Sequence, residues 1–187
     1  MKIALFGGSF NPPHNDHLKV INSVLEKKLV DEVWIIPCKD HPFEKELAPF
    51  KNRFEMLTLA TEKIPYVKIS DIENKTHGKS YSYSTVMELK KQNPKDEFYF
   101  IIGTDILESI DKWFNYKELF KEVEFFIFSR QGFPMKEIDG MKYKFIQDIV
   151  GKISSTEVRS RLQNGDSVSN LIPQKVEDYI RKNRLYL

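Results

Sequence analysis

Two histidines, His14 and His17, stand three residues apart just after a pair of glycines, Gly7 and Gly8. Side chains three apart on a helix lie on about the same side, so both imidazoles could donate hydrogen bonds to one phosphate group. When protonated, they could also stabilise the charge that builds up during phosphoryl transfer. A glycine turn followed by a surface histidine pair has the same composition, so these residues alone leave phosphate binding and a plain turn equally open.

A metal site is the less favoured interpretation of the histidine pair. No cysteine and no third histidine lies near it in the sequence, and the single cysteine, Cys38, offers no ligand spacing. A lone thiol also fits a reducing compartment. The first apolar run is too short for a signal peptide or a membrane span, so we expect a cytoplasmic protein.

The bulk composition is that of an ordinary soluble protein. The chain has 187 residues, of which 41% are apolar and 30% charged, and this length suits one compact domain. Its net charge of +2, from 29 basic and 27 acidic residues, argues against a nucleic-acid or membrane-surface protein.

Short apolar runs alternate with helical patterns through roughly the first 130 residues. The runs are apolar along both faces, which indicates a parallel sheet covered by helices on both sides. We therefore predict an α/β fold with a doubly wound parallel sheet over residues 1–150 and a small C-terminal helical part over 151–187, in a single domain. Strands are expected at residues 2–6, 31–37, 66–69, 97–102, 123–128 and 143–146, and helices near 18–25, 50–60, 84–91, 113–120, 155–162 and 174–182.

In such sheets ligands bind at the carboxyl ends of strands, near a switch in strand order. The segments that directly follow predicted strands are therefore the first site candidates. They are residues 7–17, 38–45, 103–105 and 129–132.

Two segments resemble a known pair of signatures. Residues 7–17 read Gly-Gly-Ser-Phe-Asn-Pro-Pro-His-Asn-Asp-His and resemble the Gly-Gly-Thr/Ser-Phe-Asp-Pro-x-His-x-Gly-His signature of the HxGH nucleotidyltransferases. Residues 153–159 read Ile-Ser-Ser-Thr-Glu-Val-Arg and resemble that family's second signature, Ile-Ser-x-Thr-x-Ile/Val-Arg. Alone, the second segment would be read as a helix cap. Together and in this order, the first and second signatures make the whole chain similar to the bacterial nicotinate (or nicotinamide) mononucleotide adenylyltransferases.

The resemblance implies a Rossmann-like domain that transfers AMP from Mg-ATP to a mononucleotide's phosphate and releases pyrophosphate, in NAD biosynthesis, with no covalent intermediate. Mg²⁺ would arrive with ATP as substrate. The implied partners are ATP and a pyridine mononucleotide, with no nucleic acid and no membrane, and a homo-oligomer is left open.

The resemblance also implies roles for particular residues. His14 and His17 would be catalytic. A carboxylate just after a strand can bind ribose hydroxyls, and an aromatic face suits an electron-poor pyridine ring. The ATP site would comprise Gly7, Gly8, Ser9, Phe10, His14, His17, Gly103, Asp105, Arg130, Ser154, Thr156 and Arg159. The mononucleotide site would comprise Lys39, Lys45, Tyr81, Ser82, Tyr83, Trp113 and Phe114.

Three departures from the family pattern matter. Asn11 stands where the family usually has Asp, and residues 41–45 replace its Pro-Pro-His-Lys, so acceptor choice is less secure than the chemistry. Asp16 stands where the pattern has Gly. We favour a helix cap that points away from the ligand; the alternative is a carboxylate that opposes phosphate and weakens ATP use.

Other functions stay open at this point. The acceptor could be nicotinamide mononucleotide. A sister transferase could act on phosphopantetheine or use CTP, although Trp113 and Tyr81 speak against it. A nucleotide-binding sensor or scaffold could have lost catalysis through Asp16.

Overall fold

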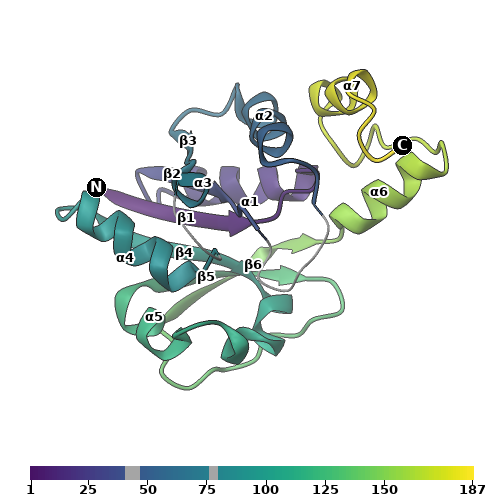
Figure 1. The fold of residues 1–187 in the computed structure, drawn as a ribbon. Coiled ribbons are helices and arrows are strands. Elements are labelled where there is room, and N and C mark those ends of the chain that lie inside the picture. Colours follow the sequence, from purple (N-terminus) through teal and green to yellow (C-terminus); the bar gives the residue numbers. More distant parts are fainter. Residues whose placement is uncertain (41–46, 76–79) are drawn as a thin grey trace.

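A computed structural model of the chain describes residues 1–40, 47–75 and 80–187, and in these residues a parallel sheet of six strands forms the centre of the molecule (Figure 1). The strand order is β3-β2-β1-β4-β5-β6, and every neighbouring pair is parallel. This order confirms the predicted doubly wound sheet. The strands are β1 (Lys2–Gly8), β2 (Glu32–Pro37), β3 (Val67–Ile69), β4 (Glu97–Gly103), β5 (Glu124–Arg130) and β6 (Tyr143–Gly151).

Helices connect and cover the strands. The described helices are α1 (Asn15–Glu26), α2 (Phe50–Thr61), α3 (Ile72–Lys75), α4 (Ser82–Gln92), α5 (Tyr116–Glu122), α6 (Ser155–Gln163) and α7 (Gln174–Lys182), with 3-10 helices η1 (Thr104–Glu108) and η2 (Ile110–Lys112). The predicted helix at 113–120 begins later, at Tyr116, because Asn115 takes a left-handed conformation with φ of 51°. No helix in the described part of the chain is both long enough and apolar enough to span a membrane.

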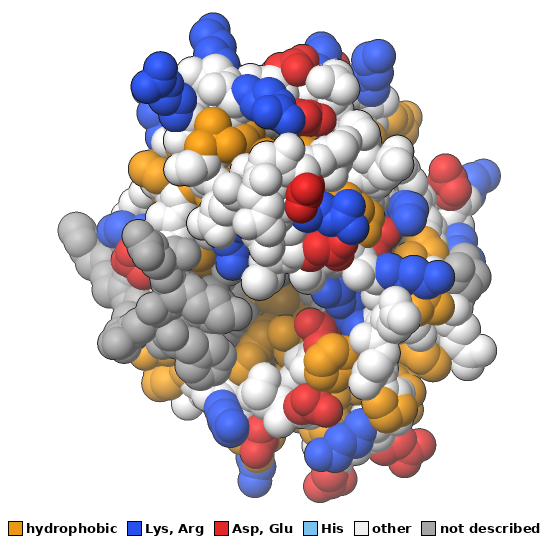
Figure 2. Space-filling view, turned by 90° about the vertical axis from the view of Figure 1, so that its right-hand side faces the viewer, with side chains coloured by type: hydrophobic (Ala, Val, Ile, Leu, Met, Phe, Trp, Pro, Cys, Tyr) orange, Lys and Arg blue, Asp and Glu red, His pale blue; other side chains and the backbone are white. Residues whose placement is uncertain are grey.

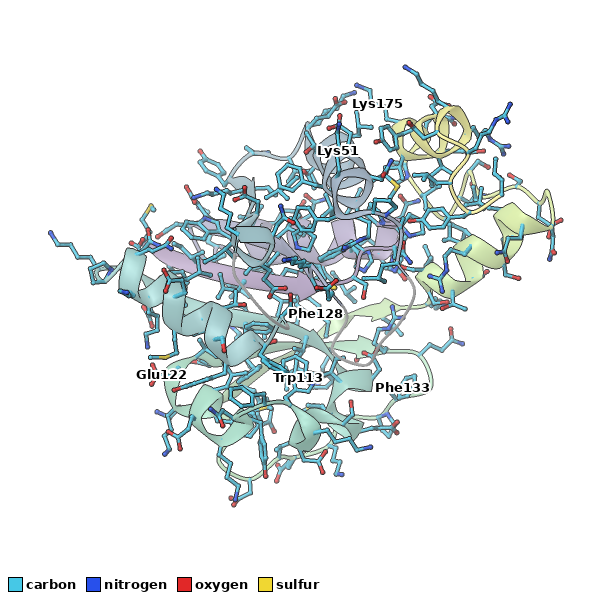
Figure 3. All side chains as sticks on the ribbon, in the orientation of Figure 1. Lys51, Trp113, Glu122, Phe128, Phe133 and Lys175 are labelled. Carbon is cyan, nitrogen blue, oxygen red and sulfur yellow. The ribbon has the colours of Figure 1, made fainter. Side chains whose placement is uncertain are left out.

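Each face of the sheet has its own apolar core, because alternate strand residues point to opposite faces. Ala4 of β1 packs with Val24 of α1 on one face. Its neighbour Leu5 packs with Leu89 of α4 and Leu119 of α5 on the other face. Trp113 lies on the α5 side of the sheet (Figure 3).

A third apolar cluster lies beside the sheet. It joins Met56 of α2 to Val158 of α6 and Ile180 of α7. Lys175 of α7 also pairs with Glu62 at the end of α2. Figure 1 shows α7 lying next to α2 at the edge of the molecule, so the C-terminal helices rest on the N-terminal half.

Strand β6 is longer than predicted. The prediction ended at Ile146, where the apolar run ends, but pairing resumes after a bulge, with Ser129 opposite Val150 and Arg130 opposite Gly151. The extension carries the chain to the carboxyl end of the sheet, so the second signature begins there. The strand order of this sheet reverses between β1 and β4.

Candidate active site

A cavity of about 660 Å³ opens at the carboxyl ends of β1 and β4. This volume is within the range of about 300–1,000 Å³ that is common for small-molecule sites. Figure 2 looks at this face of the molecule and shows a hollow near its middle, with hydrophobic side chains on its floor and charged side chains at its edge. The predicted site residues that line it are Gly7, Gly8, Ser9, His14, His17, Tyr81, Ser82, Gly103, Asp105, Trp113, Phe114, Arg130 and Ser154.

The two histidines lie together at the start of α1. Their rings stack with centroids 3.5 Å apart and planes 19° apart. The backbone N–H of His14 donates to Nδ1 of His17 at 3.1 Å, so the neutral His17 ring carries its proton on Nε2. Nδ1 of His14 is buried and has no hydrogen-bond partner among the described residues.

Both histidines are neutral at pH 7 in the ligand-free protein. Burial, and then the charge of Arg130, lower the pKa of His14 to about 4. Burial, and then the neighbouring His14 and Arg130, hold the pKa of His17 well below its usual range. The imidazoles therefore meet a ligand as hydrogen-bond donors, and they would gain positive charge only beside an added anion.

Phe10 lies in the loop between β1 and α1 and packs against His17. It is buried, with a left-handed φ of 47°. Its ring packs edge-on against His17 at 4.9 Å and Phe6 at 5.4 Å between centroids. Phe10 does not line the cavity. The structure therefore gives its side chain a packing position behind His17, and the ATP contact that the resemblance implied stays a prediction.

A hydrogen bond connects the second signature to the first. Ser154 caps α6 by accepting the N–H of Glu157 at 3.1 Å, and it also lines the cavity. Arg159 Nη1 donates to the backbone oxygen of Asn11 at 2.8 Å, and its Nη2 to the Thr156 hydroxyl at 3.2 Å. Thr156 and Arg159 do not line the cavity; Arg159 binds the first signature, and the ATP contacts predicted for both residues stay predictions.

Asp105 and Arg130 face each other across the end of the sheet. Arg130 Nε lies 3.9 Å from Asp105 Oδ1, and its backbone N–H donates to the buried Thr104 hydroxyl at 2.9 Å. A Cβ atom on Gly103 would overlap both the Asp105 carboxylate and the Arg130 side chain. A Cβ on Gly151 would lie 2.8 Å from Arg130 Nη1. Both glycines therefore leave room for this pair.

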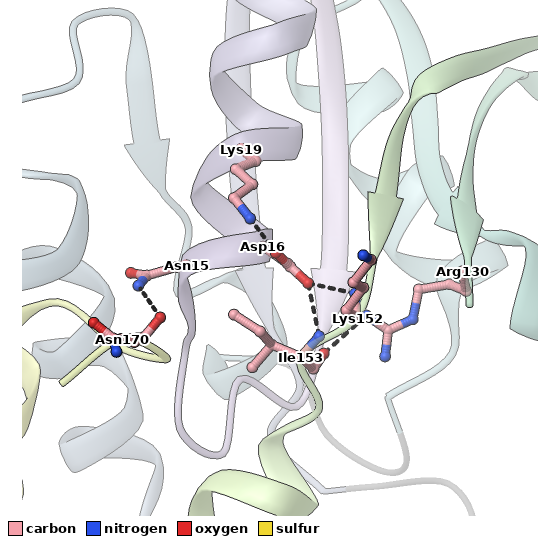
Figure 4. A network of polar contacts seen from close by, with 7 residues as sticks. All are labelled: Asn15, Asp16, Lys19, Arg130, Lys152, Ile153 and Asn170. Carbon is pink, nitrogen blue, oxygen red and sulfur yellow. Dashed lines mark hydrogen bonds and ion pairs between the residues drawn. The ribbon is translucent and has the colours of Figure 1, made fainter. Parts of the chain in front are cut away.

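Asp16 is the second residue of α1, and its carboxylate accepts hydrogen bonds from another segment (Figure 4). The backbone N–H groups of Lys152 and Ile153 donate to its Oδ2 at 2.6 and 2.7 Å. Lys19 donates to its Oδ1 at 2.8 Å. The expected cap on its own helix is therefore wrong: the carboxylate binds amides more than 130 residues away. Asp16 also lines the cavity, so the expectation that it lies away from the ligand is not confirmed either.

Aromatic residues form the other end of the cavity. The rings of Tyr81 and Phe114 lie 4.8 Å apart at 30°, and Phe114 is 48% exposed. Trp113 packs edge-on against Phe100 at 6.0 Å. Ser82 is the first residue of α4, whose first turn contains no acidic side chain. These positions suit a flat ring with an anionic substituent.

Two of the predicted mononucleotide residues do not line the cavity, and a third lies outside the described residues. Tyr83 packs against the apolar core, and Lys39 donates its backbone N–H to Ser80 Oγ at 3.2 Å; neither lines the cavity. Lys45, like the substituted stretch 41–45 around it, lies outside the described residues.

Arg53 is a structural residue that sequence reasoning missed. It is 1% exposed, and its guanidinium donates to the backbone oxygens of Ser9, Cys38, Lys39 and Ala48. It thereby ties the first signature to the segment after β2. A signal was present, because Arg53 lies at helical spacing between Phe50 and Leu57, on the apolar stripe of its helix.

Glu73 was also missed, and nothing in the spacing of the sequence marked it. It lines the aromatic end of the cavity and accepts the Thr85 hydroxyl at 2.9 Å. Burial raises the pKa of its carboxyl group, although the hydroxyls of Ser80 and Thr85 oppose this.

The described residues contain no group of three or more His, Cys, Asp and Glu side chains that could hold a metal ion. Magnesium is commonly held by substrate phosphates, waters and one or two carboxylates instead of a full protein cage. Asp105 at the cavity is one such carboxylate. The donor set thus fits a metal that enters with a nucleotide.

Comparison with known proteins assigns the chain to a family. Residues 5–161 match the cytidylyltransferase-like family. The nicotinate-nucleotide adenylyltransferase of Bacillus subtilis is 35% identical over 187 residues, covering 99% of this chain and 98% of the relative. The solved structure of Plasmodium falciparum nicotinic acid mononucleotide adenylyltransferase complexed with NaAD aligns with a TM-score of 0.88 at 26% identity, covering 99% and 97% of the two chains. The same enzyme complexed with APC aligns with a TM-score of 0.86 at 25% identity, covering 99% and 96%.

Proposed function

Because the chain belongs to the cytidylyltransferase-like family and, within it, to the nicotinate-nucleotide adenylyltransferases, we propose that it transfers AMP from Mg-ATP to nicotinate mononucleotide. The family membership makes it a nucleotidyltransferase. The products would be the deamido-NAD dinucleotide and pyrophosphate, which is a step in NAD biosynthesis. A relative of the same fold binds NaAD, and this supports the proposed acceptor.

One observation carries the proposal: a single cavity joins a phosphate-binding end to an aromatic end. The first end has His14, His17 and the glycine turn of β1. The second has Tyr81 and Phe114. A transferase that joins two nucleotides needs both in one space, so that the attacking and leaving oxygens lie in line.

In the proposed step, a phosphate oxygen of the mononucleotide attacks the α-phosphorus of ATP, and the bond from that phosphorus to the bridging oxygen of pyrophosphate breaks. No proton must be removed from an ionised phosphate, so the protein needs no general base. His17 would donate from Nε2 to the phosphates, and Arg130 would add fixed positive charge. Mg²⁺ bound to ATP would neutralise charge on the leaving pyrophosphate.

The start of α4 favours nicotinate over nicotinamide. Its first-turn N–H groups and the positive end of its dipole attract a carboxylate more than a neutral amide. Ser82 adds a hydroxyl at this position, and the turn itself contains no acidic residue. The neighbouring Glu73 carboxyl already accepts the Thr85 hydroxyl, and burial raises its pKa, which lessens its opposition to an anion.

The test is to incubate the protein with Mg-ATP and either nicotinate or nicotinamide mononucleotide, and to measure dinucleotide and pyrophosphate in equal amounts. We expect turnover with the first acceptor to exceed that with the second, and chelation of Mg²⁺ by EDTA to abolish it. Absence of turnover with both acceptors would refute the proposal. Replacing ATP by CTP in one assay, or the acceptor by phosphopantetheine in another, tests the sister activities.

A further inference from the structure

The carboxylate of Asp16 joins the two signatures at a buried contact. The residue is 3% exposed, and its two oxygens receive three donors: the N–H groups of Lys152 and Ile153, and the ammonium of Lys19. Burial alone would raise the carboxyl pKa, but the N–H groups of Ile153 and Lys152 and the ammonium of Lys19 together outweigh it and keep the pKa below its usual value. The group is therefore ionised and already has donors for both oxygens.

The segment that Asp16 holds leads directly into the phosphate end of the cavity. Both backbone groups of Ile153 are hydrogen-bonded, because Arg130 Nη1 also donates to its carbonyl oxygen at 3.0 Å (Figure 4). The next two residues, Ser154 and Ser155, line the cavity. A shift of the 152–153 backbone would therefore move these serines and release Arg130 from one of its anchors.

We propose that Asp16 is a positioning residue, which fixes the start of the second signature so that Ser154, Ser155 and Arg130 meet the nucleotide in a fixed arrangement. The inference rests on the proposed function, because it takes this end of the cavity as the ATP site. It assigns the carboxylate at the family's glycine position a supporting role toward ATP. A glycine at position 16 would supply no side-chain acceptor for these two N–H groups.

The test compares Asp16→Ala, Asp16→Asn and Lys19→Met in the full chain. Asp16→Ala leaves two buried N–H groups without an acceptor. We expect the Lys152 and Ile153 amides to exchange hydrogen at least about tenfold faster, measured by NMR, and the Kd of ATP to rise about tenfold by calorimetry. The Kd of nicotinate mononucleotide should change by less than about twofold, because its end of the cavity is separate.

The other two variants separate positioning from loss of charge. Asp16→Asn keeps one carbonyl oxygen that can accept both amides, so it should restore most of the slow exchange and most of the ATP affinity, and it serves if the alanine variant fails to fold. Lys19→Met removes only the ion pair of a side chain that is 60% exposed, so both amide bonds and the ATP affinity should stay as in the wild type.

Unchanged or tighter ATP binding in Asp16→Ala would overturn the proposal, and tighter binding would show that the carboxylate opposes phosphate. An equal loss of affinity for both substrates would also overturn it, because that is general damage to the fold. Neither readout needs turnover. A wild-type protein that binds ATP but makes no dinucleotide would therefore contradict the proposed function without affecting this inference.

Discussion

At the scale of single residues, the protonation of His14 and His17 is the property that most affects the chemistry. Their stacking, their burial and the nearby Arg130 all disfavour a positive charge in the ligand-free protein. A bound triphosphate would reverse that balance, because an adjacent anion favours the charged imidazole. The site thus holds two neutral donors until the nucleotide supplies negative charge.

Replacing His17 by alanine should show whether it stabilises the transition state. We expect turnover to fall by about 100-fold or more, since loss of one such donor typically costs about 10²–10³ in rate. Steady-state kinetics with saturating ATP measures this. The control is Asn15→Ala on the same helical turn, whose side chain bonds Asn170 instead of lining the cavity. A fall in turnover of less than about tenfold in His17→Ala would show that the histidine pair has only a structural role.

Acid should destabilise the ligand-free protein through the same two residues. Their folded-state pKa values lie below the ordinary value of 6.5, and that of His14 is about 4. The unfolded chain therefore binds protons that the folded chain does not, so their contribution to stability is complete above pH 6.5 and is lost as the pH falls toward 4. Urea unfolding across this range measures it.

The double variant His14→Asn, His17→Asn is the matched control, and its stability should depend less on pH over this range. An NMR titration should also give His14 a pKa of about 4 without ATP and a higher value with ATP. An ordinary pKa in the ligand-free protein would contradict the neutral pair.

At the scale of elements, side chains from one segment hold the loops that carry the site on another. Arg53 of α2 donates to the backbone oxygens of Ser9 and Cys38, in the two segments that follow β1 and β2. Arg159 of α6 binds the oxygen of Asn11. The Tyr186 hydroxyl at the C-terminus donates to the Asn11 side chain at 2.6 Å. The first signature is therefore shaped by α2, α6 and the C-terminal residues together.

Removing the Arg53 guanidinium should loosen the first signature. Arg53→Met keeps much of the apolar stem but leaves four carbonyl oxygens without their donor. We expect a loss of about 3 kcal/mol or more in the free energy of unfolding, measured by urea denaturation. Arg161→Met is the control: its ion pair with Glu157 is on the surface, and its loss should cost less than about 1 kcal/mol. Equal effects of the two variants would refute a special role for Arg53.

At the scale of the whole molecule, the C-terminal helices bring the second signature to the end of the sheet. Helices α6 and α7 bury their apolar faces against each other and against Met56 of α2, not against the sheet itself. Ile180 has no exposed surface in this cluster. The packing of α7 should therefore affect both stability and the placement of α6 at the cavity.

Truncating Ile180 tests that coupling. Ile180→Ala should lower the free energy of unfolding by about 2–5 kcal/mol, as other large-to-small core changes do, and should also weaken ATP binding. Leu187→Ala is the control, since Leu187 is 63% exposed, and its effect should stay within about 0.5 kcal/mol. Full stability in Ile180→Ala would show that this cluster adds little to the fold.

Local sequence determined the strands, most helices and the two signatures. Apolar runs such as residues 97–102 must be buried on both faces, and this requirement alone predicted the parallel sheet. The glycine turn was found from its position directly after a strand, whereas Trp113 and Phe114 were assigned to the site through the family resemblance. The family membership followed from the same short segments and agrees with the comparisons.

Only the tertiary structure decided what the charged residues do. Asp16 was expected to act on its own helix, yet its carboxylate binds amides 136 and 137 residues away. Arg159 binds a loop, Arg53 holds four carbonyl oxygens, and the histidines are neutral because of what surrounds them. The physical reason is that the state of a buried charge depends on solvent exclusion and on distant donors and acceptors, and the folded chain, not the local sequence, sets both.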